Sequence, residues 1–522
     1  MAETGATADV DAPHITPTMT TMQRLRAIVG GSAGNLVEWY DWFAYTSFSF
    51  YFAESFFPKG NEDLALLQAA ITNMVSFGAR PVGAWIMGMY ADRAGRKTAL
   101  IVAVLMMCVG ALIMAIAPTY DQLGGASGNG YLAAWIIAGA RLVQGLSVGG
   151  QYGAAATYMS EVAPKGKRGF WSSFQYVTLI GGQLLASIVL LVLQHMYPES
   201  MLKAGGWRIA FWIGAGLAIV VFFVQAFIHE SHSFKAIKQK EKVDFRHAAA
   251  VVAALAVCLV ILIFRLPVHE KGLAKWWPCI LALLPTALIL VWPMAKRFPK
   301  QTLAIMGLTL AGTSGFYAYS TYMLKFLAAG HTSMTLNFTG QLFTQAAMDA
   351  QGHPVVGTVL YPKDVANLIN IYYLTIFMFA QPLMGFLSDR FGRKRMLLLA
   401  FGGGALVAYP VYTLIAQSGG NFGQSLLLCT VPLLILSAYT SISAIVKAEL
   451  FPAAVRALGV ALPYAIANAA AGAMVEPLAL GWKTSGHENY FFVYLSVMMV
   501  IGFLAAAFLL HETSKKSEIV ED

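Results

Sequence analysis

Long apolar runs, separated by short polar stretches, make up most of this chain of 522 residues. A helix needs about 20 predominantly apolar residues to cross the hydrocarbon core of a bilayer. By that criterion the pattern predicts fourteen membrane-spanning helices. They are expected near residues 30–53, 66–90, 98–117, 130–159, 170–195, 208–229, 247–264, 276–295, 302–327, 364–388, 396–416, 425–449, 457–480 and 490–511.

The composition supports an all-α polytopic membrane protein. Hydrophobic residues make up 58% of the chain and charged residues only 12%, against about 25% charged residues in soluble domains. The net charge of +9 therefore gives no reason to expect a nucleic-acid partner, and the lipid bilayer is the expected surroundings. Residues 1–20 are polar and lack the apolar core of a signal peptide, so no cleavable leader is expected.

The positions of lysine and arginine predict the orientation. Most of them lie in alternate short loops, with clusters at 93–97, 165–168, 235–246 and 390–395. Because such loops stay on the cytoplasmic side, both termini are predicted to be cytoplasmic. Five cations fall inside the predicted spans: Arg80, Arg141, Arg208, Lys325 and Lys447.

An internal repeat divides the chain into two halves. "GMYADRAGRK" (Gly88–Lys97) follows the second span, and "GFLSDRFGRK" (Gly385–Lys394) occupies the matching position in the later part of the chain. Such a repeat predicts two six-helix halves. The expected organisation is a tail at 1–23, a first half at 24–230, a linker at 231–300, a second half at 301–512 and a tail at 513–522.

The linker at 231–300 is predicted to hold the two additional spans as a helical hairpin. The rival interpretation is a pair of helices on the membrane surface. Such helices should have one polar face, and 248–264 has almost no polar residue, which favours the hairpin. The outer loop at about 328–363 is long for a compact core and is expected to lie over the outer mouth.

The repeated loops also predict a latch. An aspartate there can interact with the positive end of the next helix, and the basic residues hold the loop at the inner face. Topology and capping alone would explain the motif, but a gating role is expected as well. The predicted gating residues are Gly88, Asp92, Arg93, Gly95, Arg96, Gly385, Asp389, Arg390, Gly392 and Arg393.

Several long motifs resemble a known family. The doubled D-R-x-G-R-K loop is similar to that of the major facilitator superfamily, and "GNLVEWYD" (Gly34–Asp41) resembles its metabolite:proton symporter branch. Similar patterns are "QGLSVGGQYGAAATYMSEVA" (Gln144–Ala163), "SFQYVTLIGGQLLA" (Ser173–Ala186), "TYMLKFL" (Thr321–Leu327) and "YTSISAIVKAELFPAAVRALGV" (Tyr439–Val460). The resemblance covers about 30–230 and 302–510.

That resemblance implies proton-coupled uptake of a small organic acid across the inner membrane, for example a dicarboxylate such as α-ketoglutarate. Other solutes of the branch remain open, namely citrate, shikimate, aromatic acids, or zwitterions such as proline and betaine. A membrane receptor that does not transport is a further alternative. The chain departs from the family at Gln151, where relatives carry an acid, so a proton role at this position is in doubt.

Glu38 and Asp41 are the first candidates for proton coupling. They lie three residues apart on one face of a predicted span, where each ionised acid costs about 2.5–3.5 kcal/mol or more. Arg141 lies in an R-x-x-Q-G pattern to which the resemblance assigns a part in proton coupling. An arginine stays charged and can control the protonation of a nearby carboxylate, so we expect it to pair with Glu38 or Asp41. A static pair that fixes helix packing is the alternative. Glu476 is a second candidate protonation site.

Buried cations are the candidates for substrate binding. Arg80 lies about ten residues from the inner motif, near mid-membrane, where a structural pair with an acid is the alternative. Lys325 and Lys447 suggest the second side of a clamp that a dicarboxylate could bridge, although either could reach the membrane surface and Glu449 could pair with Lys447. Plausible hydrogen-bonding walls are Tyr45, Gln175, Tyr176, Gln183, Tyr322, Tyr439 and Ser443.

No cofactor, metal site or catalytic residue is predicted. The four cysteines lie in apolar runs without metal-ligand spacing, and no G-x-x-x-x-G-K-[ST] loop is present. Enzyme activity is therefore not expected, and the energy for transport must come from an ion gradient. The expected partners are a small organic anion, protons and the bilayer, and the expected state is a monomer.

Overall fold

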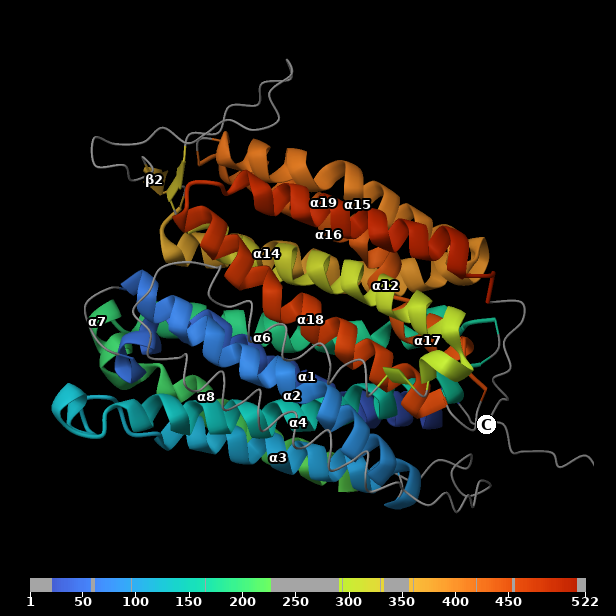
Figure 1. The fold of residues 1–522 in the computed structure, drawn as a ribbon, viewed down its shortest axis with the longest axis horizontal. Coiled ribbons are helices and arrows are strands. Elements are labelled where there is room, and N and C mark those ends of the chain that lie inside the picture. The colour runs from blue at the N-terminus through green and yellow to red at the C-terminus, as the bar shows by residue number, and fades with distance from the viewer. Residues whose placement is uncertain are drawn as a thin grey trace, which may run out of the picture.

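The computed structural model (Figure 1) describes residues 21–57, 62–94, 96–164, 166–226, 291–292, 294–328, 330–332, 356–359, 361–418, 420–452 and 456–513. The first half is helical throughout. Its elements are α1 (Thr21–Phe56), α2 (Glu62–Ala94), α3 (Arg96–Ile116), η1 (Gly125–Ser127), α4 (Tyr131–Val162), α5 (Arg168–Ser172), α6 (Phe174–Met196), α7 (Glu199–Met201), η2 (Leu202–Gly206) and α8 (Arg208–Ala226).

The second half repeats this plan with more interrupted helices. Its elements are α12 (Pro299–Tyr317), η4 (Ala318–Tyr322), α13 (Met323–Leu327), α14 (Lys363–Phe391), α15 (Arg393–Ala416), α16 (Phe422–Thr440), α17 (Ser443–Glu449), α18 (Arg456–Thr484), α19 (Asn489–Leu504) and η6 (Ala505–Leu509). A single turn of π-helix at η4 joins α12 to α13, so these three elements together form one predicted span.

Twelve of the predicted spans coincide with helices of the structure. The linker hairpin, predicted near 247–264 and 276–295, lies outside the described residues apart from its last few positions. Most of the outer loop at 328–363 also lies outside the described residues. Its described ends form a short antiparallel ribbon in which β1 (Gly330–Thr332) pairs with β2 (Val356–Val359), a small departure from the all-α expectation.

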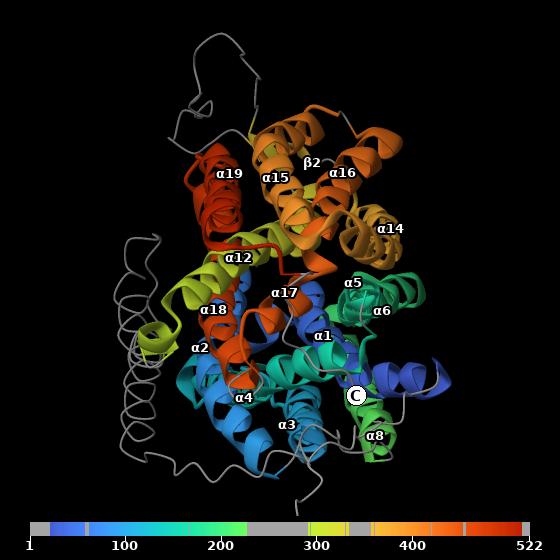
Figure 2. The same cartoon turned by 90° about the vertical axis from the view of Figure 1, so that its right-hand side faces the viewer.

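The helices run roughly parallel to one another, and the two halves lie side by side. Figure 2 looks along the bundle, with the first half in blue to green and most of the second half, in yellow to red, above it. Several helix pairs join the halves, and two of them form the main seams: α2 packs against α18, and α6 packs against α14. Arg80 and Glu476 belong to the first seam, and Gln175, Tyr176 and Gln183 to the second, whereas Asp41 and Arg141 lie within the first half.

Nine helical segments of the described part are long and apolar enough to cross a membrane. α1, α2 and α12 are not among them, because these helices place polar side chains in the interior. α1 buries Asn35, Glu38 and Asp41, and α2 buries Asn73 and Arg80. α1 and α2 therefore carry three of the charged side chains in which chemistry is expected, Glu38, Asp41 and Arg80.

The halves approach closely at the end of the bundle where the repeated loops lie, which we call the motif end. A Cβ atom added at Gly385, on α14, would lie 2.5 Å from the carbonyl oxygen of Gly169, on α5. It would also lie 3.1 Å from the Cβ atom of Ser173. Glycine is therefore required at 385 for the halves to close at this end.

Gly385→Ala should destabilise this closed arrangement by about 1–3 kcal/mol, because the added methyl group overpacks the interface. Gly216→Ala, on α8, is the matched control, since nothing lies within 4 Å of a Cβ atom there. Thermal unfolding of the purified protein in detergent measures both. Equal melting temperatures for the two variants would show that the close approach at Gly385 does not contribute to stability.

Candidate functional site

Asp41 and Arg141 form a buried ion pair between α1 and α4. The Asp41 Oδ2 atom lies 3.5 Å from Nη1 of Arg141, and their side chains are 2% and 1% exposed. The guanidinium also lies over the ring of Tyr45, with its carbon 3.6 Å from the ring centroid. Asp41 rather than Glu38 is thus the partner of Arg141, which decides between the two predicted pairings. Tyr45, predicted as a substrate wall, lies with this pair instead.

Glu38 lies one turn earlier on α1 and is also buried. Its Oε2 atom has no hydrogen-bond partner among the described residues. Arg80 is the cation whose charge acts on this carboxylate. The two acids of α1 therefore have different surroundings, because one is paired directly with an arginine and the other is not.

Arg80, on α2, is held by the second half of the chain. Its Nη1 atom donates to Oδ1 of Asn468, on α18, at 2.6 Å and to the hydroxyl of Tyr317 at 3.4 Å. The guanidinium lies over the ring of Phe77 at 4.2 Å and is 3% exposed. No ion pair to a carboxylate within the described residues neutralises it. The alternative of a structural pair with an acid therefore finds no support in this part of the chain.

Lys447 occupies an aromatic box, which consists of Tyr152, Tyr439 and Tyr464. The ammonium lies 5.3, 5.7 and 4.3 Å from these three ring centroids. It donates to the hydroxyls of Ser443 at 2.7 Å and Tyr152 at 3.1 Å. Lys447 is fully buried, so it does not reach the membrane surface, and no acid of the described residues pairs with it.

Glu449, predicted as an alternative partner for Lys447, points elsewhere. Its carboxylate accepts from Nε and Nη2 of Arg393, at 3.0 and 3.3 Å. Glu449 and Lys447 are only two residues apart, and for that reason the α17 helix places them on different faces. The alternative pairing of Glu449 with Lys447 is therefore not formed in this structure.

Lys325 and Glu476 pair with each other. The Lys325 ammonium on α13 contacts Oε1 of Glu476 on α18, and both side chains are nearly buried. The sequence assigned the lysine to substrate binding and the acid to proton coupling. In this structure each compensates the charge of the other, so neither is available to a ligand unless the pair separates.

The predicted hydrogen-bonding walls divide into two groups. Tyr176 lies near Tyr152, Tyr439 and Ser443, and the buried amide of Gln175 has no hydrogen-bond partner among the described residues. Gln183 instead donates to the carbonyl of Ser320 at 2.5 Å. Tyr322 donates to Glu488 at 3.2 Å. The last two side chains are thus engaged away from Lys447.

A narrow cavity lies between α1, α2, α12, η4 and α18. It is lined by Trp42, Ala70, Asn73, Met74, Phe77, Tyr317, Thr321, Gly472, Ala473, Val475, Glu476 and Pro477. Phe77 and Tyr317, which contact Arg80, belong to this lining, and so does Glu476. The cavity thus connects the surroundings of Arg80 with the Lys325–Glu476 pair.

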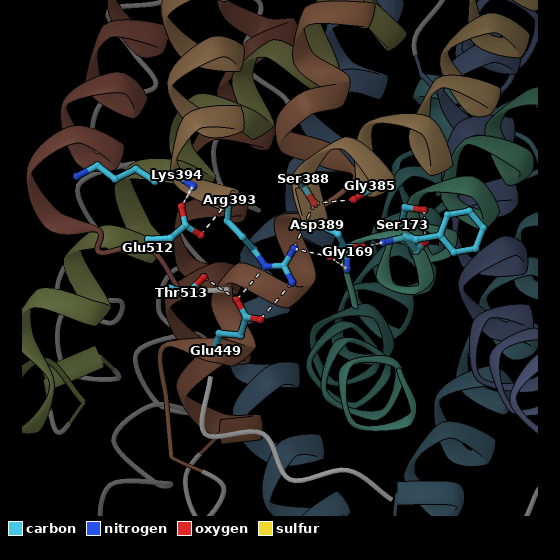
Figure 3. A network of polar contacts seen from close by, with 11 residues as sticks. Gly169, Ser173, Gly385, Ser388, Asp389, Arg393, Lys394, Glu449, Glu512 and Thr513 are labelled. Carbon is cyan, nitrogen blue, oxygen red and sulfur yellow. Dashed lines mark hydrogen bonds and ion pairs between the residues drawn. The ribbon is translucent and has the colours of Figure 1, made fainter. Parts of the chain in front are cut away.

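The second repeated loop forms a polar network at the motif end (Figure 3). The Asp389 carboxylate accepts from the backbone N–H groups of Gly169 and Phe170, at 2.8 and 2.9 Å. Arg393 donates to Asp389 at 3.2 Å and pairs with Glu449. This network therefore joins the second half to the start of α5 in the first half.

The other gating residues lie outside this network or are not described. Arg390 is exposed, and Gly392 has a φ of 95°, which favours glycine where α14 ends and α15 begins. The remaining gating residues, from the first repeated loop, lie outside the described part. This applies to the side chains of Asp92, Arg93 and Arg96, to the surroundings of Gly88, and to Gly95 as a whole. The side chain of Gln151 also lies outside the described part.

A second set of contacts joins the halves at the opposite end of α14. Asn367 and Asn370 donate to the carbonyl and hydroxyl oxygens of Ser187, on α6, at 3.0 and 2.9 Å. Lys363 donates to Glu199 at 3.2 Å. The Lys363 ammonium holds the pKa of the Glu199 carboxyl below its ordinary value. Both ends of α14 are therefore attached to the first half.

Some of these residues were missed by sequence reasoning. Tyr152 and Tyr464 complete the box around Lys447, and Asn468 and Tyr317 hold Arg80. One signal was present, since Tyr464, Asn468, Gly472 and Glu476 are four residues apart on one helical stripe. Tyr317 had no such signal.

Comparisons with known proteins show which families the chain resembles. Residues 27–266 match the family model "Sugar (and other) transporter", and residues 354–522 match "Major Facilitator Superfamily". The chain is 38% identical to the alpha-ketoglutarate permease of Escherichia coli strain K12, over 99% of each chain. It is 26% identical to the glycine betaine/proline/ectoine/pipecolic acid transporter OusA of Dickeya dadantii, over 94% of this chain and 84% of that protein.

The fold is also similar to that of a solved structure. The proton:xylose symporter XylE superimposes with a TM-score of 0.66, covering 96% of this chain and 100% of XylE at 18% identity. At that identity the likeness concerns the fold alone.

Replacing Asp41 by Asn should destabilise the protein by about 3–5 kcal/mol, because it leaves the buried Arg141 without its partner. Arg141→Gln should cost a similar amount for the same reason. The double variant should recover much of that loss, since no unpaired charge remains. The unfolding free energies of the wild type, the two single variants and the double variant form a double-mutant cycle. Strictly additive losses would mean that Asp41 and Arg141 do not stabilise each other.

The contact between Lys363 and Glu199 should depend on pH. Since the Glu199 pKa is lowered from about 4.5, the contact stabilises the closed end above that pH. The stabilisation is lost as the pH falls through the lowered value. Thermal stability of the wild type minus that of Glu199→Gln should thus be constant from pH 7 to about 5 and decrease in more acidic buffer. A difference that does not change with pH would contradict this assignment.

Proposed function

This chain belongs to the major facilitator superfamily, and we propose that it is a proton-coupled symporter for a small organic acid. The proposed substrate is a dicarboxylate such as α-ketoglutarate, taken up by alternating access. The observation that carries the proposal is the pair of buried cations, Arg80 and Lys447, which have no carboxylate partner among the described residues. They lie on opposite halves of the protein.

The protein is a multi-pass membrane protein of the cell inner membrane. We propose fourteen spans in all, with the linker hairpin outside the six-plus-six core and both termini cytoplasmic. The motif end is then the cytoplasmic end. The domain limits proposed from the sequence, with halves at 24–230 and 301–512, follow from this arrangement. A monomer without nucleic-acid partners or catalytic activity is sufficient for the function.

The substrate carboxylates would bind to Arg80 and Lys447. Arginine presents a planar fork that matches a carboxylate. The buried ammonium of Lys447 would gain from an anion the opposite charge that its two hydroxyl partners and the tyrosine rings do not supply. Gln175, Tyr176, Tyr439 and Ser443 would supply hydrogen bonds. Gln183 and Tyr322 have other partners here and would contribute only after a rearrangement.

The proton sites in this proposal are the acids of α1. Protonation of Asp41 would release it from Arg141, and protonation of Glu38 would remove a buried charge near Arg80. Glu476 is a third candidate, since its protonation would free Lys325. Gln151 cannot carry a proton, which leaves the coupling to these acids.

The energetics require more than one proton. A dianion that enters an inside-negative cell works against about 2.3 kcal/mol per charge per 100 mV, or about 4.6 kcal/mol in total. Two protons cancel this electrical cost. Glu38 and Asp41 together, or one of them with Glu476, would supply the two sites.

The runner-up substrate is a zwitterion such as proline or betaine. The resemblance to OusA and the three tyrosines around Lys447 favour it, because aromatic boxes bind quaternary ammonium groups. However, this box already holds a lysine ammonium, which would repel such a ligand. An anion is therefore the better fit.

Uptake into vesicles with an imposed pH gradient tests the function. With two protons per dianion and no membrane potential, the wild type should accumulate α-ketoglutarate about 100-fold for one pH unit. The variant Glu38→Gln plus Asp41→Asn should lose this accumulation. Glu54→Gln, a third acid of α1 that is only half-buried, should retain it.

Two results would contradict the proposal. Accumulation by the double variant equal to that of the wild type would remove both acids from the coupling. No uptake of any dicarboxylate, combined with uptake of betaine or proline, would assign the protein to the zwitterion alternative.

A further inference from the structure

Asn468 lies at the centre of a polar network around Arg80. Its Oδ1 atom accepts from Nη1 of Arg80 at 2.6 Å. Its Nδ2 atom donates to the hydroxyl of Thr313 at 3.2 Å and to that of Tyr464 at 3.4 Å. Because arginine can only donate, these contacts allow one orientation of the amide, with its oxygen toward the guanidinium.

The network occupies only part of the guanidinium. Nη1 has two partners, Asn468 and Tyr317, whereas Nε has no hydrogen-bond partner among the described residues. The ring of Phe77 lies against one face, 4.2 Å from the guanidinium carbon to the ring centroid. The open donors thus lie on the Nε edge, which together with Nη2 forms a fork suited to a carboxylate.

We propose that Asn468 is a positioning residue that directs the Nε edge of Arg80 toward the substrate carboxylate. It holds Nη1, so the planar group cannot rotate freely and its free edge keeps one direction. A neutral amide suits this role, because an acid at 468 would neutralise the charge that the substrate needs. The inference rests on the proposed function, in which Arg80 binds a carboxylate.

This arrangement makes substrate binding depend on both halves. Arg80 belongs to α2 and Asn468 to α18, which pack against each other along one seam of the halves. The guanidinium is therefore oriented only when the seam is closed. A carboxylate on the Nε edge would bind more tightly to the closed seam, and binding would favour closure.

A double-mutant cycle on substrate affinity tests the proposal. Binding of α-ketoglutarate to the purified full-length protein is measured by titration calorimetry for wild type, Asn468→Ala, Arg80→Lys and the double variant. Asn468→Ala should weaken binding about tenfold. In the Arg80→Lys background the same change should have little further effect, because a lysine has no planar edge to orient.

Two more variants separate positioning from a loss of structure. Tyr317→Phe removes the second, longer contact to Nη1 and should weaken binding by a smaller factor. Asn468→Asp keeps the shape but compensates the charge, so it should weaken binding more than Asn468→Ala. Ser496→Ala is the control, since that hydroxyl bonds only to its own helix in the described structure, and it should bind as the wild type does.

The outcomes are distinct. Unchanged affinity in Asn468→Ala, or fully additive losses in the double variant, would overturn the positioning role while leaving Arg80 in the site. Unchanged affinity in Arg80→Lys would remove Arg80 from the site, and would overturn this inference together with that part of the proposed function.

Discussion

A charge buried away from water must be compensated, and this constraint organises the interior of the protein. Asp41 pairs with Arg141, and Lys325 pairs with Glu476. At the motif end Arg393 is shared by two acids. Arg80 and Lys447 are buried as well, but neither forms an ion pair with a carboxylate of the described residues, and their hydrogen bonds go to neutral oxygen atoms. A dianion between them would complete the same pattern, which is why an anionic substrate fits the structure.

One helix, α14, is bonded to the other half of the protein at both of its ends. α14 carries Asn367 and Asn370 near its beginning and Asp389 near its end, and all three bond to the first half. Each set alone would hold one end shut. Alternating access requires the two sets to release at different times, so that the interior faces one side of the membrane and then the other.

The sequence predicted the positions of the helices better than the pairing of the buried side chains. Apolar run length predicted twelve segments that are helices in the structure, because that signal is local. The α1 acids and Arg141 were also found, but helical periodicity could not choose between Glu38 and Asp41. That choice depends on how α1 is rotated against α4, which no local pattern encodes.

The contacts that the sequence did not predict have a common physical cause. Lys325 and Glu476 were given separate roles because they are far apart in the chain, although α13 and α18 bring them into contact. Glu449 was considered for Lys447 because they are close in sequence, although it faces Arg393. Tyrosines such as Tyr152 and Tyr464 look like ordinary packing residues until the fold places a lysine between them.

The most direct test of the central claim is an experimental structure of the protein with a bound dicarboxylate. The account predicts one carboxylate within hydrogen-bond distance of the Arg80 guanidinium and the other at the Lys447 ammonium. Asp41 and Arg141 would lie outside the contact. A dicarboxylate bound at Arg141 or Lys325, with Arg80 and Lys447 both untouched, would contradict it.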